Sequence, residues 1–182
     1  MNPMTEKENM KDGVVETFYK NGQLKFRGNY NNGKRDDLWE WFHENDQPKQ
    51  RGNYKDGKRD GLWETFYFTS NNNPLVLHGP INTRGNYKDG KRDGLEENFY
   101  KNGQLRNRKN YKNGKRDGLV ENFHKNGELK FRENYKNGKE DGLSEKFHEN
   151  GQLWNRSNYK DGEQDLSETY HENGQLRQRE TY

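Results

Sequence analysis

The chain has 182 residues, of which 25% are hydrophobic and 35% charged, with a formal net charge of +3 and no cysteine. So little aliphatic material excludes a large enclosed active-site cavity, and the lack of cysteine excludes disulfide frameworks and thiolate chemistry. No apolar run has the length of a spanning helix or a signal peptide, so we expect a cytoplasmic protein, in a bacterium or in the host of a virus. The interspersed charges argue against nucleic acid as a partner.

Internal repetition is the strongest signal in the sequence. Residues 1–12 form a lead-in, and residues 13–182 contain seven copies of one unit. The regular unit is 24 residues long, as from Gly118 to Asp141. The third copy carries an insertion at 68–82, and the seventh lacks the leading glycine. Copies begin near Gly13, Asp37, Gly61, Gly94, Gly118, Gly142 and Leu166.

Each copy is predicted to form two short strands and two turns. Asn-Gly pairs such as Asn126-Gly127 lie inside the copies and predict type I′ hairpin turns, in which both central residues have positive φ. Asn-Gly and Asp-Gly pairs such as Asn137-Gly138 lie between copies. The segments between turns are too short for ordinary helices. The expected fold is therefore all-β: an elongated antiparallel meander of about seven hairpins in a single twisted sheet.

The hairpin turns also predict a register. A two-residue turn at Asn126-Gly127 places Glu121 opposite Arg132, and each copy repeats this pair. If the turn between copies is a four-residue loop centred on Gly138-Lys139, Arg132 also faces Glu145. Opposed charges across strands contribute about 0.2–1 kcal/mol each. We therefore expect a ladder of glutamates and arginines that fixes the register along the sheet.

Apolar residues are divided between both predicted faces. Leu119 and Phe123 share the face of the ladder, whereas Phe131 and Tyr135 lie on the other face. We expect Tyr135 to lie against Gly142 of the next copy, where the missing side chain leaves room for the ring. Two apolar stripes of this kind suit a single sheet better than a sandwich.

The repeated unit reads G-L-x-E-x-F-[YH]-x-N-G-Q-L-x-x-R-x-N-Y-K-x-G-K, which resembles the MORN-repeat-variant family. The matching positions in the first and last copies are Phe18, Asn21, Gly22, Leu24, Tyr30, Gly33, Tyr170, Asn173, Gly174 and Leu176. The resemblance implies a row of β-hairpins without a shared enzymatic activity. Related proteins are scaffolds or membrane-apposed modules, bacterial members are often antitoxins, and large DNA viruses encode similar arrays. In the second copy Asn45-Asp46 replaces Asn-Gly, which places that hairpin's geometry in question.

The sequence predicts neither a metal site nor a catalytic site, and no cofactor. Four histidines occupy one repeat position that holds tyrosine in other copies: His43, His124, His148 and His171. Equivalent residues of neighbouring copies lie two strands apart, about 9–10 Å, which is too far for shared zinc ligation. The recurring glutamates are paired with arginines, unlike a catalytic carboxyl group in a cleft. We therefore expect that the protein is not an enzyme.

Basic pairs recur at one edge of the predicted sheet. They are Lys34-Arg35, Lys58-Arg59, Lys91-Arg92 and Lys115-Arg116. These eight cations could bind anionic lipid headgroups, each contributing about 1 kcal/mol near a membrane surface. Alternatively, they only keep the edge soluble, since an aspartate follows each pair.

Two further regions are candidates for contact with a partner protein. Trp39 and Trp63 share one repeat position and, with Tyr54 and Tyr87, could form an aromatic patch. Alternatively, these rings only cover a thin sheet. The insertion contains Leu75, Val76 and Leu77. It could form a binding loop or an elongated hairpin packed on its neighbour.

The sequence thus favours a non-enzymatic repeat scaffold that binds another protein through an extended sheet face. Attachment to anionic membrane lipids through the Lys-Arg turns is the first alternative. Antitoxin-like neutralisation of a partner protein, which rests on the family resemblance, is the second.

Overall fold

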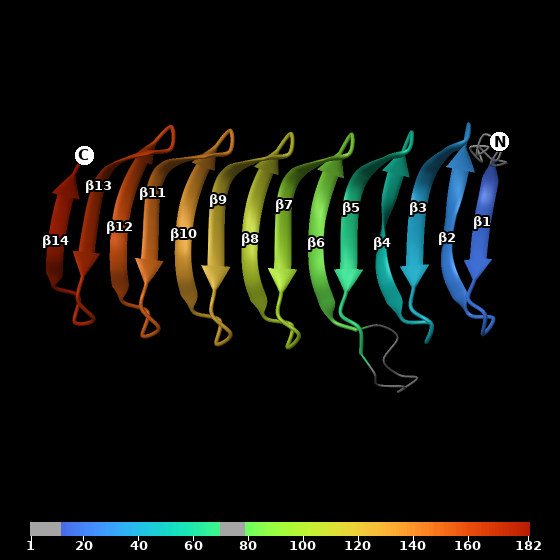
Figure 1. The fold of residues 1–182 in the computed structure, drawn as a ribbon, viewed down its shortest axis with the longest axis horizontal. Helices are drawn as coiled ribbons and strands as arrows, with labels where there is room; N and C mark the ends of the chain where they lie inside the picture. The colour runs from blue at the N-terminus through green and yellow to red at the C-terminus, as the bar shows by residue number, and fades with distance from the viewer. Residues whose placement is uncertain (1–11, 70–78) are drawn as a thin grey trace, which may run out of the picture.

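The computed structural model describes residues 12–69 and 79–182. These residues form one fourteen-stranded antiparallel sheet in which each strand pairs with the next along the chain (Figure 1). The strands are β1 (Gly13–Phe18), β2 (Leu24–Asn31), β3 (Lys34–Phe42), β4 (Pro48–Lys55), β5 (Lys58–Phe66), β6 (Ile81–Lys88), β7 (Lys91–Phe99), β8 (Leu105–Lys112), β9 (Lys115–Phe123), β10 (Leu129–Lys136), β11 (Lys139–Phe147), β12 (Leu153–Lys160), β13 (Glu163–Tyr170) and β14 (Leu176–Thr181).

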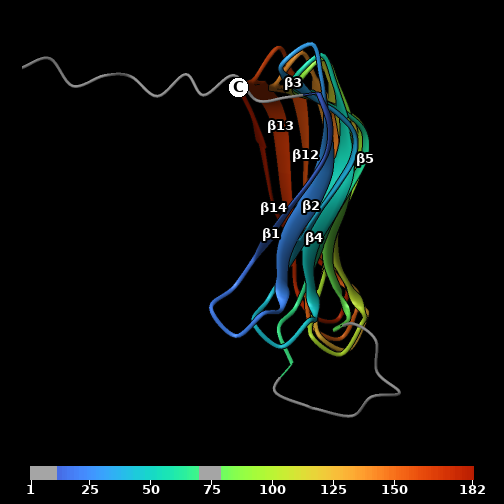
Figure 2. The ribbon, with the colours of Figure 1, turned by 90° about the vertical axis from the view of Figure 1, so that its right-hand side faces the viewer.

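The sheet is open, with β1 and β14 at opposite ends, and the predicted all-β meander is confirmed. Seen from its N-terminal end, it is a thin layer that bends rather than lying flat (Figure 2). No helix of the described residues is long and apolar enough to cross a membrane. Because the described strands form one layer, the side chains of each face must shield one another from water.

The two kinds of turn are assigned the opposite way from the prediction. Between copies, both central residues have positive φ, as in Asn137 (52°) and Gly138 (92°), which defines type I′. Inside a copy only the glycine has positive φ, as in Gly127 (89°). The predicted type I′ turn at Asn126-Gly127 is therefore wrong.

Side-chain hydrogen bonding explains the turn inside the copy. His124 N donates to Glu128 O at 2.8 Å and closes a five-residue loop. Glu128 N donates to Asn126 Oδ1 at 3.0 Å, an Asx-type bond that favours this longer loop. Within this turn, only the glycine adopts the left-handed backbone conformation. As a result Leu129 faces Phe123, one residue away from the register of a two-residue turn.

A β-bulge follows each type I′ turn up to β11 and restores the predicted pairing. Tyr135 is opposite Glu140, as the two-residue turn at Asn137-Gly138 requires. The register then shifts through a segment that contains Gly142 (φ 106°), and beyond it Arg132 is opposite Glu145. The four-residue loop considered from the sequence is absent here, but the pairing it implied is present.

In the first six copies the tyrosine lies opposite the first residue of its own copy, not the next. Tyr135 is paired with Gly118, so the predicted contact with Gly142 is wrong. Gly142 lies instead beside Asn134, where a Cβ would be 3.5 Å from the Asn134 Cβ. That distance is ordinary van der Waals contact, so the bulge needs glycine there for its positive φ and not for space.

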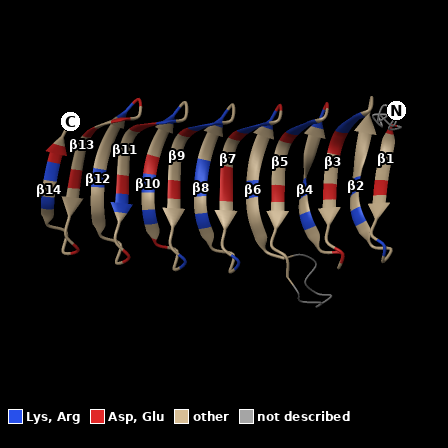
Figure 3. Cartoon of the chain, viewed as in Figure 1, with Lys and Arg blue, Asp and Glu red and all other residues tan. Residues whose placement is uncertain are grey.

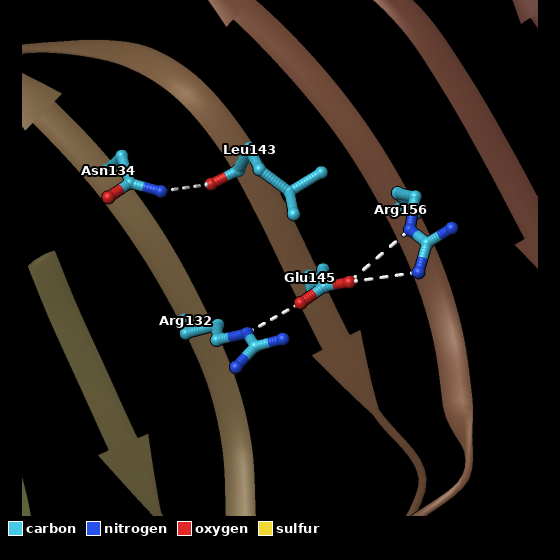
Figure 4. A network of polar contacts seen from close by, with 5 residues as sticks. All are labelled: Arg132, Asn134, Leu143, Glu145 and Arg156. Atoms are coloured by element: carbon cyan, nitrogen blue, oxygen red, sulfur yellow. Dashed lines mark hydrogen bonds and ion pairs between the residues drawn. The ribbon is translucent and has the colours of Figure 1, made fainter.

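The glutamate–arginine ladder is confirmed. Arg132 is opposite both Glu121 and Glu145. The Arg132 Nε and Glu145 Oε2 atoms are 2.5 Å apart, and Arg156 Nη2 lies 3.1 Å from Glu145 Oε1 (Figure 4). The pairs that join the arginine of one copy to the glutamate of the next are Arg27–Glu40, Arg51–Glu64, Arg84–Glu97, Arg108–Glu121 and Arg132–Glu145. We call the side of the sheet that carries these pairs the ladder face.

The second copy keeps the hairpin despite its altered turn. Asp46 takes the place of the loop glycine with a φ of 61°, and His43 N still donates to Gln47 O at 2.8 Å. Asp37 likewise takes the place of the bulge glycine with a φ of 58°. Aspartate tolerates this left-handed region better than most residues, so the hairpin geometry survives.

Candidate functional site

The opposite side of the sheet, which we call the variable face, changes along the chain while the ladder face repeats. One of its positions changes residue type along the odd strands from β3 to β13. These residues are Trp39, Trp63, Glu96, Val120, Ser144 and Ser167. Two residues further along β3, Trp41 lies on the same face. A recognition site is therefore to be sought on this face, because there one repeat position changes from tryptophan to glutamate, valine and serine along the chain.

Trp39 lies flat against the sheet over a glycine of the preceding strand. A Cβ on Gly28 would lie 2.2 Å from an indole carbon, so only glycine admits the ring. Trp39 Nε1 donates to Asn29 O at 3.0 Å. The Arg35 guanidinium covers the indole at 4.4 Å from the ring centroid, and Tyr30 packs edge-on at 5.2 Å. The ring is thus enclosed within a single-layered sheet.

The same arrangement recurs one copy later. A Cβ on Gly52 would lie 2.3 Å from an indole carbon of Trp63. Arg59 covers this indole at 4.0 Å, and Tyr54 packs edge-on at 5.2 Å. Trp41 lies between the two sites, at 5.8 Å from each indole centroid. We call the following set the aromatic cluster: Phe26, Tyr30, Trp39, Trp41, Tyr54, Trp63 and Tyr87.

The structure brings the four predicted aromatic contact residues together but buries two of them. Trp39 is 0% exposed and Trp63 5% exposed, because glycine, arginine and tyrosine enclose each indole. Their role as contact residues stays a prediction. Tyr54 and Tyr87 remain partly exposed, and so does Trp41, which the prediction did not include. The sequence signal for including Trp41 was its position two residues after Trp39 in one strand, which places both side chains on the same face.

The variable face becomes polar in the C-terminal half. Tyr135 marks the change, because its hydroxyl accepts from Arg116 Nη1 at 3.2 Å and donates to Glu133 Oε2 at 3.1 Å. Burial and the nearby Glu133 carboxylate raise the pKa of the Tyr135 hydroxyl to about 12. Beyond it, Tyr159 donates to Gln164 Oε1 at 2.8 Å. The tyrosine row is continuous, but its partners change from cations to acceptors.

The predicted Lys-Arg pairs separate onto two different surfaces. Arg35 and Arg59 point onto the variable face and stack on indoles, and Arg116 lies over the Tyr135 ring at 5.1 Å. The lysines stay at the edge where the type I′ turns lie, which Figure 3 shows in blue. Each lysine that follows a type I′ turn is opposite the lysine that precedes that turn. The exception is Lys34, which is opposite an asparagine. We call the paired residues the lysine edge: Lys55, Lys58, Lys88, Lys91, Lys112, Lys115, Lys136 and Lys139.

Open grooves lie along the lysine edge. One of about 860 Å³ includes Lys58, Lys88, Lys91 and Lys112 in its lining, and a second of about 820 Å³ includes Lys136. Aspartates line both grooves, but they have a structural role. Asp93 Oδ2 accepts a hydrogen bond from Asn113 N at 3.0 Å. Equivalent aspartates accept a hydrogen bond from the backbone of the next type I′ turn in the same way.

The histidine row carries no metal site among the described residues. Where this position holds tyrosine, its hydroxyl bonds the next copy, as Tyr100 Oη does by donating to Phe123 O at 2.9 Å. The shorter His124 and His148 side chains leave Nε2 buried without a hydrogen-bond partner. These histidines therefore replace tyrosine in the packing between loops.

Both ends of the insertion are anchored, the second by Pro80 O, which accepts from Tyr67 N at 2.9 Å, and its centre lies outside the described residues. Phe68 packs edge-on against His43 at 5.1 Å, and Thr69 N donates to Gln47 Oε1 at 3.2 Å. Leu75, Val76 and Leu77, predicted to bind a partner, belong to the part that the structure does not describe.

Comparison with known proteins agrees with this architecture. The sequence model of the MORN repeat variant matches residues 11–32, 38–56, 92–113, 116–137, 140–161 and 166–182. The third copy, which contains the insertion, is not among the matched segments, although β5 and β6 form the same hairpin. No curated protein sequence matches the chain. Since the matched segments cover more than half of it, the chain belongs to the MORN repeat variant family.

Proposed function

We propose that this protein is a non-enzymatic scaffold that binds another protein through the variable face of strands β2–β6. Members of the family are in general non-catalytic repeats that bind proteins or membrane lipids. The supporting observation is that the glutamate–arginine pairs of the ladder face repeat from copy to copy, whereas the aromatic cluster occupies one stretch of the variable face. Partly exposed aromatic rings beside arginines are the side chains that most often dominate protein interfaces.

Site-specific photo-crosslinking in cells tests the proposal. Benzoylphenylalanine replaces Trp41 on the variable face or Leu38 on the ladder face of the same strand, where Leu38 is 46% exposed. We expect a discrete adduct with a partner protein from the Trp41 position and none from Leu38. Equal adducts from both positions, or adducts from Leu38 alone, contradict the proposal. The identity of the adduct also shows whether the partner is a toxin, as the antitoxin alternative requires.

Binding of anionic lipid at the lysine edge is the second candidate. It is supported by eight exposed lysines along one edge and by the two grooves between them. The test is sedimentation with phosphatidylserine-rich vesicles at low and high salt, using a variant with Lys88, Lys91, Lys112 and Lys115 changed to glutamine. A matched control changes Lys20, Lys25, Lys101 and Lys125, which lie away from this edge.

We expect salt-sensitive sedimentation that the edge variant loses and the control variant retains. Equal losses in both variants would assign the binding to net charge alone, since each near-surface cation contributes about 1 kcal/mol wherever it lies. That outcome removes this second candidate without affecting the first.

A further inference from the structure

The arginines of the two faces differ in how their charge is compensated. Every arginine of the ladder, from Arg27 to Arg179, forms an ion pair with a glutamate. On the variable face, Arg92 pairs with Glu96 at 2.5 Å. Within the described residues, no carboxylate forms an ion pair with Arg35 or Arg59. Two cations therefore lie uncompensated on the aromatic cluster.

Arg35 and Arg59 are held in place by neutral groups. Arg35 Nη1 donates to the Tyr54 hydroxyl at 3.1 Å, and Arg59 Nη1 to the Tyr87 hydroxyl at 3.5 Å. Each guanidinium also stacks on an indole, Trp39 or Trp63. Stacking and hydrogen bonding restrict the side-chain conformations before any ligand arrives, while the remaining donors stay available for a carboxylate. Both sites are therefore preorganised to bind an anion.

The spacing of the two arginines selects a conformation for an elongated ligand. They occupy equivalent positions of β3 and β5, two strands apart, which is about 9.6 Å. A polyproline II helix has three residues per turn and advances about 9.3 Å per turn, so residues i and i+3 point the same way at this spacing. An extended strand offers same-side spacings of about 6.6 and 13 Å, and an α-helix about 10.5 Å at i and i+7. Polyproline II matches best.

The surface between the two arginines suits the same conformation. Trp41 and Tyr54 lie between the buried indoles, with Tyr54 6.1 Å from Trp39 and 5.2 Å from Trp63. Proline-rich segments in polyproline II conformation dock on aromatic-lined surfaces with a low entropic cost. Rings are therefore available where the residues between two carboxylates would lie.

We propose that the aromatic cluster binds an acidic, proline-rich peptide segment in polyproline II conformation that runs across strands β3–β5 along the long axis of the sheet. Carboxylates at i and i+3 bind Arg35 and Arg59, and prolines between them pack on Trp41 and Tyr54. This inference rests on the proposed function, because it names the chemistry of the partner at the same face.

The test measures binding of fluorescently labelled peptides to the full chain by anisotropy. The probe consists of four Glu-Pro-Pro triplets. Three comparison peptides carry Lys-Pro-Pro triplets, Glu-Pro-Pro-Pro quartets, or an α-helix with glutamate at every seventh position. We expect the Glu-Pro-Pro peptide to bind at least about tenfold more tightly than each of the others, since tenfold corresponds to about 1.4 kcal/mol and one lost charged hydrogen-bonded pair costs that much or more.

Variants locate the binding. Arg35→Gln and Arg59→Gln are each expected to weaken binding of the Glu-Pro-Pro probe about tenfold. Arg116→Gln, at the same repeat position but outside the aromatic cluster, should leave the affinity within about twofold. The wild-type comparison of the triplet and quartet peptides needs no variant, so it decides the question even if an arginine variant unfolds.

Equal affinity for the triplet and quartet peptides, tighter binding of the helical peptide, or no binding of the triplet peptide overturns the inference. The proposed function fails separately. If benzoylphenylalanine at position 41 captures a partner while no Glu-Pro-Pro peptide binds, the scaffold function stands and the assigned partner chemistry is wrong.

Discussion

The first three hairpins and the last four share a ladder face and differ on the variable face. In both regions arginines and glutamates alternate across the strands, with Arg51–Glu64 at 2.7 Å in one and Arg132–Glu145 at 2.5 Å in the other. On the variable face, Trp39 and Trp63 give way to Ser144 and Ser167 at the same repeat position. One face therefore specifies the sheet, and the other is free to acquire local chemistry without changing the fold.

Removing a buried indole should have the largest effect and should expose the difference between the halves. Trp39 is 0% exposed, so Trp39→Ala is expected to lower the free energy of unfolding by about 3–5 kcal/mol. The matched change is Val120→Ala, at the same repeat position and 2% exposed, which should cost less because a smaller side chain is removed. Chemical denaturation measures both values. Equal losses would mean that the buried indole contributes no more stability than the valine at the same repeat position.

Filling the space under the indole should have the next largest effect. A Cβ at Gly28 would meet the rigid Trp39 ring at 2.2 Å, whereas one at Gly85 would meet the flexible Glu96 side chain at 3.3 Å. Gly28→Ala is therefore expected to destabilise the protein by about 1–3 kcal/mol, as overpacking does. Gly85→Ala, at the same repeat position, should change stability little. A shift in melting temperature for Gly28→Ala alone confirms the prediction, and similar shifts for both variants contradict it.

The ladder and the turn inside the copy show where prediction from the sequence succeeded and where it stopped. The repeat length and the ladder spacing of Glu121 and Arg132 follow from local pattern, so the sheet and its register could be predicted. The turn at Asn126-Gly127 was predicted wrongly, because the bond from Glu128 N to the Asn126 side chain lengthens the loop. Such competition between side-chain and backbone acceptors is not visible in a dipeptide.

The candidate site was harder to predict than the fold for a geometric reason. The sequence indicated that Trp39, Trp63, Tyr54 and Tyr87 gather on one face, and they do. It did not indicate that each indole would lie over a glycine of the preceding strand and under an arginine. Burial of a ring depends on these contacts across strands, and therefore the exposed and enclosed members of the cluster could not be separated from pattern alone.

Breaking the ladder should cost the same in both halves. Glu64 and Glu121 are similarly buried, at 8% and 7% exposed, and each pairs with one arginine of the preceding copy. Glu64→Gln and Glu121→Gln are each expected to lower the free energy of unfolding by about 1–3 kcal/mol, because a charge-assisted hydrogen bond is weakened. Costs that differ by more than about 1 kcal/mol would show that the variable face alters the ladder.

The smallest effect concerns the turn of the second copy. Asp46 holds a φ of 61°, which glycine adopts without strain and aspartate does not. Asp46→Gly is therefore expected to raise the free energy of unfolding by about 0.5–1 kcal/mol. The reverse change, Gly127→Asp, should cost more than this, because the φ of 89° at Gly127 is further from the conformation that aspartate tolerates. Paired denaturation curves test both changes. If Asp46→Gly is neutral or destabilising, the carboxylate has a stabilising contact that outweighs the backbone strain, and the second hairpin differs from the others by more than its turn residue.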